Sequence, residues 1–552
     1  MIFDVYASPI FRVDRDQVLG TPGIRGLVRA TLRFSPFDGA NTNSVVSVHR
    51  MRQNWEEPSA TWNCPSDYDL TNYTPECNPA SWNIDAADPW DRPYAVAATD
   101  TILLDDIPAW VEFDVTADVL GLLDGDPGHG WIVRVESGNP YVYFASRENG
   151  SNPSPELVLE MRDDSFVPTA CPPPDLDDSR ITRVADVVEH VYSGACPVQF
   201  GASDSVLVPE AVAHLRGKVI GPDGTGLSGV HVRILGRSDF GWTRSRAGAG
   251  DLGTWDLVVN GGGPLVVEFS KPGYLTVQRR VEPIRNDYLV LDDVVLLPQQ
   301  DGNDCAHVSG ATGDFYLGPV MTDARGSRRL GMYFPSGSTM TITDASSSTV
   351  TDYCICSVEY TADRTGGATG QRAMPGALPT TSAYTYAAEL QLRPFDPMAG
   401  TCDDAPIPEP TFSAPIFAYV LDHDQSAGTT FVGFGVGTAV PSGYYDEDAA
   451  AWVAEPDGRV VQIVDNGSGG CAFDVTGDGV ADSIIDGVAA HHVTAAELAA
   501  FASHCGAGLE YSIGDRLWRI PVYHFSPRTG TGPSRSSAEP CFPSSSGPAT
   551  AA

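Results

Sequence analysis

The chain has 552 residues, and its 34 Lys and Arg residues against 71 Asp and Glu residues give a formal net charge of −37. A negative field of this size repels nucleic acid and anionic membrane surfaces and attracts divalent cations, so neither nucleic acid nor membrane insertion is expected. A chain of this length is predicted to form three or four domains, and it holds no apolar stretch long enough to span a membrane.

Residues 1–162 are predicted to form a first β-sandwich. Short segments with period-two alternation, from 27–34 to 157–161, are separated by Gly, Pro, Asn and Asp turns. This pattern is typical of β-sandwiches. One short helix is expected at 114–123, with Asp114 or Thr116 as its N-cap.

Four motifs follow one another in this region: Trp55-Glu-Glu-Pro-Ser-Ala-Thr-Trp62-Asn63, Phe113-Asp-Val-Thr116, Gly130-Trp131 and Phe144-Ala-Ser-Arg147-Glu148. In this combination the segment resembles the DNRLRE family. The resemblance implies a jelly-roll module similar to certain carbohydrate-binding modules, found on secreted and surface bacterial proteins. Arg147 and Glu148 are expected to form a structural ion pair at a sheet edge.

Tryptophan faces stack on the apolar side of a sugar ring, which makes the tryptophans of this module candidate ligand contacts. Trp55 and Trp62 bracket a family motif and are expected in the core. Trp82 and Trp90 lie in a loop-rich insert after Cys64 and Cys77, so these two are the predicted ligand-binding residues.

Residues 163–212 are predicted to form a polar, proline-containing linker with a helical stretch at 181–191. Residues 213–298 contain a strand, an Asp223-Gly224 turn, a second strand ending at Ile234, and further strands after it. This segment resembles the carboxypeptidase regulatory-like domain. The resemblance implies a small transthyretin-like β-sandwich that carries no catalytic residues and serves as a spacer.

Residues 299–530 are predicted to form a larger all-β region, with strands at 330–334, 350–358, 384–392, 431–434 and 458–464. Segments at 334–339, 373–379, 440–446 and 517–525 resemble the region before the YD repeats of bacterial RHS-repeat proteins. The resemblance implies an RHS/YD-repeat shell as a partner. Residues 531–552 are rich in Ser, Pro, Gly and Ala and are predicted to be disordered.

An acidic loop inside this region has the spacing of a calcium site. Calcium takes six to eight oxygens, which an EF-hand supplies from a loop of twelve positions. When Asp474 is taken as position 1 of such a loop, Gly479 stands at position 6, where the loop turns sharply. Position 12 is Ile485 in place of Glu, and an Asp follows one place late. The predicted calcium ligands are the side chains of Asp474, Thr476, Asp478, Asp482 and Asp486 and the carbonyl of Val480. The alternative is an acidic turn that caps a strand. A capping box of Thr494 and Glu497 predicts a short helix after the loop.

The eleven cysteines contain no CxxC pair, so a zinc site is not expected from them. The separations of Cys64–Cys77, Cys171–Cys196 and Cys471–Cys505 suit local disulfides, and an odd count leaves one thiol over. Such cysteine usage favours an extracellular or cell-surface location. The first residues have neither the basic region nor the apolar run of a signal peptide, which predicts a truncated or misassigned start.

No catalytic residue is predicted. The chain has no G-x-S-x-G elbow, P-loop or dinucleotide-binding fingerprint. The pairs Asp105–Asp106 and Asp403–Asp404 offer paired carboxylates of the kind that glycosidases use. We expect these residues to lie in solvated loops instead. His491, His492 and His504 are the histidines from which a zinc site would be built, but we expect them to be ordinary surface histidines.

The predicted fold class is all-β: a multi-domain chain of β-sandwiches with one short helix after the acidic loop. The predicted function is non-catalytic binding and spacing on a secreted or cell-surface protein, with a glycan or cell-surface partner and a calcium-stabilised loop. Two alternatives remain: the scaffold or plug portion of an RHS-repeat toxin or delivery protein, and a glycan-active enzyme.

Overall fold

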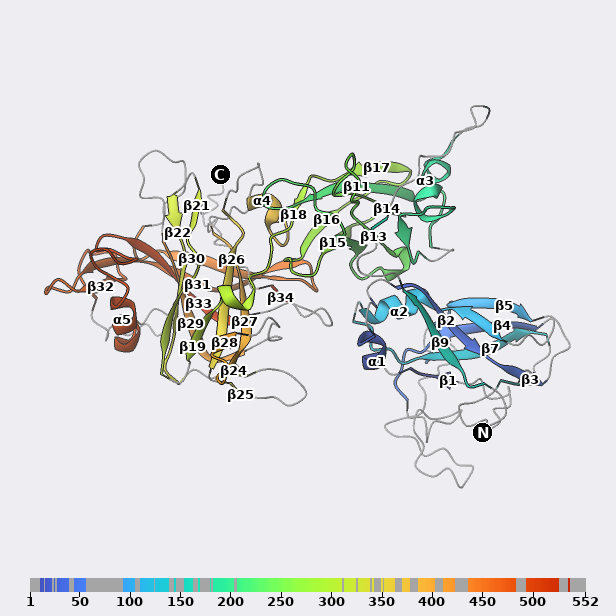
Figure 1. The fold of residues 1–552 in the computed structure, drawn as a ribbon, viewed down its shortest axis with the longest axis horizontal. Coiled ribbons are helices and arrows are strands. Elements are labelled where there is room, and N and C mark those ends of the chain that lie inside the picture. The colour runs from blue at the N-terminus through green and yellow to red at the C-terminus, as the bar shows by residue number, and fades with distance from the viewer. Residues whose placement is uncertain are drawn as a thin grey trace, which may run out of the picture.

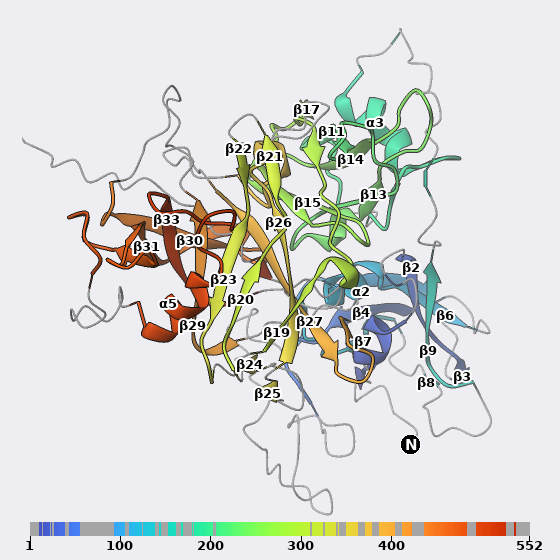
Figure 2. The same cartoon turned by 60° about the vertical axis from the view of Figure 1, so that its left-hand side comes forward.

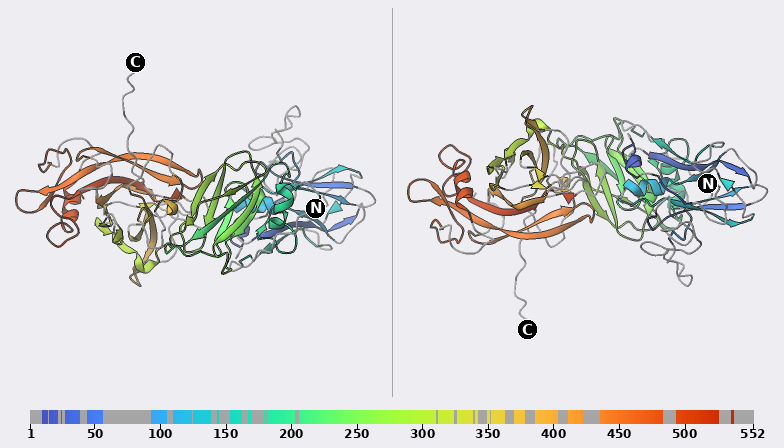
Figure 3. Two further views of the ribbon diagram at one scale, coloured as in Figure 1. Left: turned by 90° about the horizontal axis from the view of Figure 1, so that it is seen from above. Right: turned by 90° about the horizontal axis from the view of Figure 1, so that it is seen from below.

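The computed structural model describes residues 10–55, 93–161, 167–168, 179, 182–362, 370–377, 386–402, 411–421, 435–482, 493–525 and 535–536, apart from gaps at 14, 22–23, 25–26, 39–43, 105–109, 124, 139–142, 145–152, 203–205, 310–311, 324–325, 338–339, 342–348 and 351. These residues form several mostly antiparallel sheets and a few short helices, which confirms the all-β prediction. The sheets lie in a row along the long axis, with the N-terminal domain in blue, the middle domain in green and the C-terminal domain in yellow to red (Figures 1 and 3).

The N-terminal domain packs two sheets face to face. One sheet has the order β1-β7-β4-β5, and the other has the order β6-β2-β9. The core between them holds Leu32 and Phe34 from one sheet and Val46 and Val48 from the other, because apolar residues alternate with polar ones along each strand. The strands are β1 (Ile10–Phe11), β2 (Leu27–Phe34), β4 (Ser44–Arg50), β5 (Asp100–Leu104), β6 (Val111–Asp114), β7 (Trp131–Ser137) and β9 (Glu156–Met161), with β3 (Pro36–Asp38) paired to β8 (Tyr143–Phe144).

Two short helices, α1 (Arg15–Leu19) and α2 (Thr116–Leu123), close one end of this sandwich. The helix predicted at 114–123 is therefore confirmed as α2, and the Asp114 carboxylate accepts the Thr116 N–H at 2.9 Å at its start. Trp55 is buried, as predicted, and its Nε1 donates to the His129 carbonyl at 2.8 Å.

The middle domain is a second sandwich, with sheets of order β10-β13-β12-β15-β16 and β14-β11-β17. Its core is centred on Trp255 and Phe269, and Gly217 lies close beside them, since a Cβ at that position would lie only 3.0 Å from the Trp255 ring. The predicted Asp223-Gly224 turn is present, with Gly224 at φ +81°. The elements are α3 (Val184–Tyr192), β10 (Gln199–Phe200), β11 (Val212–Ile220), β12 (His231–Ile234), a 3₁₀ turn η2 (Ser238–Phe240), β13 (Trp242–Arg244), β14 (Thr254–Asn260), β15 (Leu265–Ser270), β16 (Val277–Val281), β17 (Asp287–Val290) and β18 (Val294–Val295).

The C-terminal domain combines a large sheet, β20-β23-β29-β33-β31-β30-β34, with a smaller one, β19-β26-β27-β28, over a shared apolar core (Figure 2). Four of the five strands predicted here are present, and the one at 431–434 lies outside the described residues. The strands are β19 (Ala306–Ser309), β20 (Asp314–Leu317), β21 (Met321–Asp323), β22 (Gly326–Arg328), β23 (Leu330–Phe334), β24 (Met340–Thr341), β25 (Thr349–Val350), β26 (Asp352–Glu359), β27 (Ala388–Asp396), β28 (Thr401–Cys402), β29 (Thr411–Leu421), β30 (Ala439–Asp446), β31 (Ala451–Asp465), β32 (Cys471–Asp474), β33 (Arg516–His524) and β34 (Arg535–Ser536).

Helix α5 (Ala495–Ala502) follows the acidic loop, and α4 (Gly370–Ala373) is a single turn. The predicted capping box is confirmed, because the Thr494 hydroxyl accepts the Glu497 N–H at 3.1 Å and the Glu497 carboxylate accepts the Thr494 N–H at 3.4 Å. Glu497 is fully buried and also accepts from Arg519 Nε at 2.7 Å. This ion pair ties the helix to strand β33. No helix in the described part of the chain is long and apolar enough to cross a bilayer.

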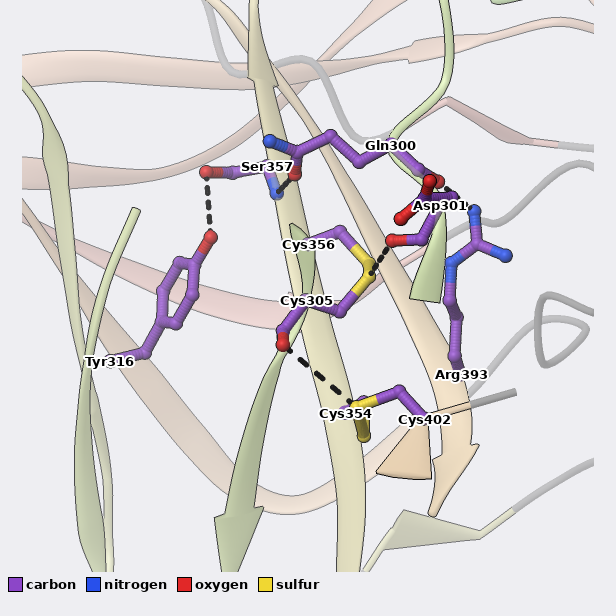
Figure 4. Close-up of a disulfide and its surroundings, with 9 residues drawn as sticks. All are labelled: Gln300, Asp301, Cys305, Tyr316, Cys354, Cys356, Ser357, Arg393 and Cys402. Atoms are coloured by element: carbon purple, nitrogen blue, oxygen red, sulfur yellow. Dashed lines mark hydrogen bonds between the residues drawn. A yellow bond between two sulfur atoms is a disulfide. The ribbon is translucent and has the colours of Figure 1, made fainter. Parts of the chain in front are cut away.

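Two disulfides lie within the smaller C-terminal sheet and next to its first strand. Cys354 and Cys356 lie two residues apart on β26, and they pair with Cys402 on β28 and with Cys305 before β19 (Figure 4). The predicted bridge between Cys471 and Cys505 is also confirmed. Cys196 is disulfide-bonded as well, while the other members of the predicted pairs, Cys64, Cys77 and Cys171, lie outside the described residues.

Buried contacts join the three domains. Trp242 of the middle domain donates from Nε1 to the Leu27 carbonyl of the N-terminal sandwich at 2.7 Å, and its ring is part of that sandwich's core. On the other side, the buried Gln278 side chain donates to the Glu447 carbonyl at 2.9 Å and accepts from the Tyr445 hydroxyl at 2.9 Å. The middle domain is therefore a fixed connection between its neighbours.

Candidate functional site

The two predicted glycan-binding tryptophans, Trp82 and Trp90, lie outside the described residues, as do Arg147 and Glu148. The pairs Asp105–Asp106 and Asp403–Asp404, together with His491 and His492, lie outside them too. The candidate site is therefore formed by polar groups of the N-terminal sandwich that its described strands and helices hold in place.

A pocket opens at the end of this sandwich where α1 and α2 lie. The pocket has room for little more than a water-sized group, which suits one hydroxyl or amino substituent of a ligand. Its wall combines two guanidinium groups, two carboxyl groups and apolar side chains: Val13, Arg15, Arg50, Asp118, Leu122, Asp126, Gly128, Gly130 and Trp131.

Asp118, in the first turn of α2, is the most buried carboxyl group of the pocket. Its Oδ2 accepts from Trp131 Nε1 at 2.6 Å and from the Thr99 hydroxyl at 2.8 Å. Burial raises the pKa of Asp118, and the two hydrogen bonds together with the charge of Arg50 oppose this only in part. The two donors hold the carboxyl group rigidly against the pocket.

Asp126 also lines the pocket. Its carboxylate makes an ion pair with Arg50 Nη1 and accepts the Gly128 N–H at 3.0 Å. Arg15 Nε donates to the Asp126 carbonyl at 3.1 Å. The Arg50 side chain lines the pocket and remains 43% exposed.

Sequence reasoning did not identify this pocket. Arg50 ends β4, whereas Asp126 follows α2, and 76 positions separate the two residues. Asp118 is the one acidic residue in the first turn of α2, where a carboxylate is ordinary because it complements the helix dipole. No spacing in the chain marks the three residues as neighbours.

A second polar group lies on the outer face of the sheet that contains β4 and β7. Ser47 and His49 alternate with core valines, and both contact Glu136 Oε1, at 2.8 and 3.2 Å. The Glu136 side chain is 39% exposed. Beside it, Arg134 donates to the Tyr94 hydroxyl at 2.5 Å and lies over the Tyr94 ring. This face presents an aromatic ring together with charged groups.

The acidic loop at 474–482 is closed by hydrogen bonds to its own backbone. The buried Asp474 carboxylate accepts from the N–H groups of Thr476 (3.1 Å), Gly477 (2.6 Å) and Gly479 (2.8 Å). The positive φ of Gly479, +82°, provides the sharp turn expected at that position. The local conformation thus agrees with the turn that the sequence indicated.

The remaining predicted ligands are arranged unequally. Asp482 Oδ2 accepts the Thr476 N–H at 3.0 Å, so its carboxylate and that of Asp474 converge on the same amide. Asp478 instead accepts the Val480 N–H at 2.9 Å. Asp486 lies outside the described residues, within which no group of three or more His, Cys, Asp or Glu side chains is close enough to hold a metal ion. The described ligands fit a calcium ion only in part.

Comparison with known proteins assigns two segments. Residues 65–161 match the family model of carbohydrate-binding module family 96, and residues 208–296 match the model of the teneurin TTR-like domain. These matches support a carbohydrate-binding type of module at the N-terminus and a transthyretin-like domain in the middle. Both matched models describe non-catalytic modules.

Among curated proteins, teneurin-3 of Mus musculus is 34% identical over 96 residues, which is 17% of this chain and 3% of that protein. Teneurin-1 of Mus musculus is 37% identical over 82 residues, or 15% of this chain and 3% of that protein. The similarity thus spans about 3% of these relatives. The segments that match family models end at residue 296, and the expected likeness of residues 299–530 to RHS-repeat proteins stays a prediction.

Proposed function

We propose that this chain is a non-catalytic glycan-binding protein of the cell exterior. Its N-terminal module holds the ligand, its transthyretin-like domain sets the spacing, and its C-terminal β region carries a calcium-supported loop. The observation that carries the proposal is the pocket of Arg50, Asp118 and Asp126 in a domain that partly matches a carbohydrate-binding module.

The pocket offers the groups that sugar hydroxyls need. Each hydroxyl is both a donor and an acceptor, so neighbouring hydroxyls are recognised by a fixed acceptor beside a fixed donor. Asp118 supplies the acceptor, and the exposed part of Arg50 supplies the donors. Because both are already held by protein groups, little conformational entropy is lost when a ligand binds.

An extracellular location is supported by the three disulfides seen among the described residues and by the carbohydrate-binding module. The buried contacts of Trp242 and Gln278 support the spacing role, because they hold the module at a fixed distance from the C-terminal domain.

Calcium has a narrower role in this proposal. The ion would be held by Asp474, Asp482 and further oxygens of the loop, and it would neutralise carboxylates at the end of β32. Calcium would then stabilise the C-terminal domain and leave the glycan pocket of the N-terminal domain unchanged.

The experiment is a glycan array probed with the oxidised full chain, with calcium and again with a chelator. We expect binding that Arg50→Ala weakens strongly in both conditions, because that substitution removes the exposed donors. Arg237→Ala is the matched control, since Arg237 also pairs with a partly exposed aspartate but lies in the middle domain. No binding to any glycan, or equal losses from the two variants, would contradict the proposal.

A glycan-active enzyme is the second candidate, and one observation favours it. The raised pKa of Asp118 beside a second carboxylate, Asp126, is also the arrangement of a general acid with its partner. Release of reducing sugar from a bound glycan, abolished by Asp118→Asn, would establish that candidate in place of binding alone.

A further inference from the structure

Strand β17 is a free edge of the middle domain. Within the described residues it pairs only with β11, in parallel register from Asp287 to Val290. Figures 1 and 2 show it at the outer rim of the domain. An edge strand leaves every second backbone N–H and C=O group without a partner strand, so it is a ready template for another strand.

The side chains around this edge are unusually apolar for a solvent-facing strand. Tyr288 is 49% exposed, Val290 is 70% exposed, and Ile284 just before the strand is 68% exposed. Helix α3 covers the same sheet face at Val212 and Val258 and leaves Tyr288 and Val290 uncovered. Soluble proteins usually protect such edges with charges, prolines or bulges, and only Asp287 does so within this strand.

Charge distribution makes this edge suitable for self-association. Residues 208–296 contain ten basic and ten acidic residues, so this domain contributes nothing to the net charge of −37. The repulsion between two copies therefore comes from the flanking domains, and the β17 edge itself lies in the electrically balanced part of the chain.

We propose that two copies of the chain pair antiparallel through β17. A register centred on Leu289 places Tyr288 of one copy opposite Val290 of the other, twice, on the exposed face. The same register places Asp287 opposite Leu291, so the one charged side chain of the strand does not face a like charge. A shift by one residue would set Tyr288 opposite Leu289, whose side chain packs into the core of its own domain.

The pairing would join two glycan-binding modules in one particle. Two linked binding sites gain avidity on a surface with many identical glycans, without any new contact to the sugar. The inference stands independently of glycan binding, because it rests on the middle domain alone and is measured without a ligand.

Sedimentation of the full chain over a range of concentrations tests the proposal. We expect a monomer–dimer equilibrium that moves toward dimer as salt rises from about 0.05 to 0.5 M, because salt screens the charge of the flanking domains. Val290→Lys should weaken the dimer about tenfold or more, since it places two lysines at the seam. Val320→Lys, at a position 55% exposed in the C-terminal domain, is the control and should leave the equilibrium unchanged.

Crosslinking tests the register. Directly opposite residues have Cβ atoms about 4.5–5.5 Å apart, close enough for a disulfide after a small adjustment. A mixture of Tyr288→Cys and Val290→Cys chains should form a bridge between position 288 of one copy and position 290 of the other, identified by peptide mass spectrometry. A monomer at every concentration and salt, a dimer that Val290→Lys leaves intact, or a bridge only between identical positions would overturn the proposal.

Discussion

Asp256→Asn is expected to be among the most damaging single substitutions in the middle domain. The Asp256 side chain is only 2% exposed, and it accepts from His214 Nε2 and from Arg216 Nε, each at 2.8 Å. It also pairs with Arg246, whose side chain is 8% exposed. Removing the negative charge leaves the Arg246 guanidinium buried without its closest anion. Loss of one partner of a buried ion pair costs about 3–5 kcal/mol, and we expect the lower end because asparagine keeps one acceptor.

Hydrogen exchange measured by mass spectrometry on peptides of β11 and β14 reports the opening of this sheet directly. A loss of about 3 kcal/mol should speed exchange there about 100-fold. Asp239→Asn is the matched control, because Asp239 pairs with Arg237 at 2.9 Å in the same domain but on the surface. Such exposed pairs contribute about 0–1 kcal/mol. Equal effects of the two substitutions would refute the argument that burial makes the Asp256 charge important.

The same substitution changes the dependence of stability on pH. Burial raises the pKa of Asp256, but the hydrogen bonds from His214 and Arg216 and the charge of Arg246 outweigh burial and hold the pKa well below its usual value of 3.8. The unfolded chain therefore takes up this proton first as the pH falls. The stabilisation is complete well above pH 3.8 and is lost below it. Asp256→Asn should lack this acid-side loss, and an unchanged pH profile would contradict the assigned pKa shift.

Three further outcomes follow from the structure. Trp242→Phe removes a buried hydrogen bond to the Leu27 carbonyl. The loss should lower the free energy of unfolding by about 1–3 kcal/mol and make the connection between the first two domains more sensitive to limited proteolysis. Unchanged cleavage would show that this hydrogen bond does not hold the two domains together. Replacing Cys471 and Cys505 together by alanine opens a loop with a sequence separation of 34, which should lower the free energy of unfolding of the C-terminal domain by roughly 3–4 kcal/mol in chemical denaturation. Millimolar calcium should raise the melting temperature of the wild-type chain and not that of Asp482→Ala; a rise in both would place the ion elsewhere.

Local sequence signals predicted much of the fold. The capping box of Thr494 and Glu497 and the contact of Asp114 with the first residue of α2 were visible because they depend on residues two or three positions apart. Period-two patterns located most strands for the same reason. The burial of Trp55 also followed from its place in a motif.

Contacts between distant strands were not visible in the same way. Arg50 and Asp126 meet in the pocket because β4 and the turn after α2 end at one side of the sandwich. Likewise, Cys354 and Cys356 form separate bridges, to Cys402 and Cys305 respectively, because alternate residues of a strand project from the same face toward different neighbours. Spacing along the chain carries no information on either arrangement.

The sequence by itself determined the class of the protein: its acidity, its turn-rich strands and the two resemblances that predicted a carbohydrate-binding type of module and a transthyretin-like domain. The net charge is a sum over all residues, and the strand and turn signals depend only on neighbouring residues. Both can therefore be read from the sequence without knowledge of the fold. Only the tertiary structure decided which charges are buried, as at Asp256, and which strand has a single partner among the described residues, as β17 does. Burial and edge exposure depend on which segments pack together, and in a β protein those segments lie far apart in the chain.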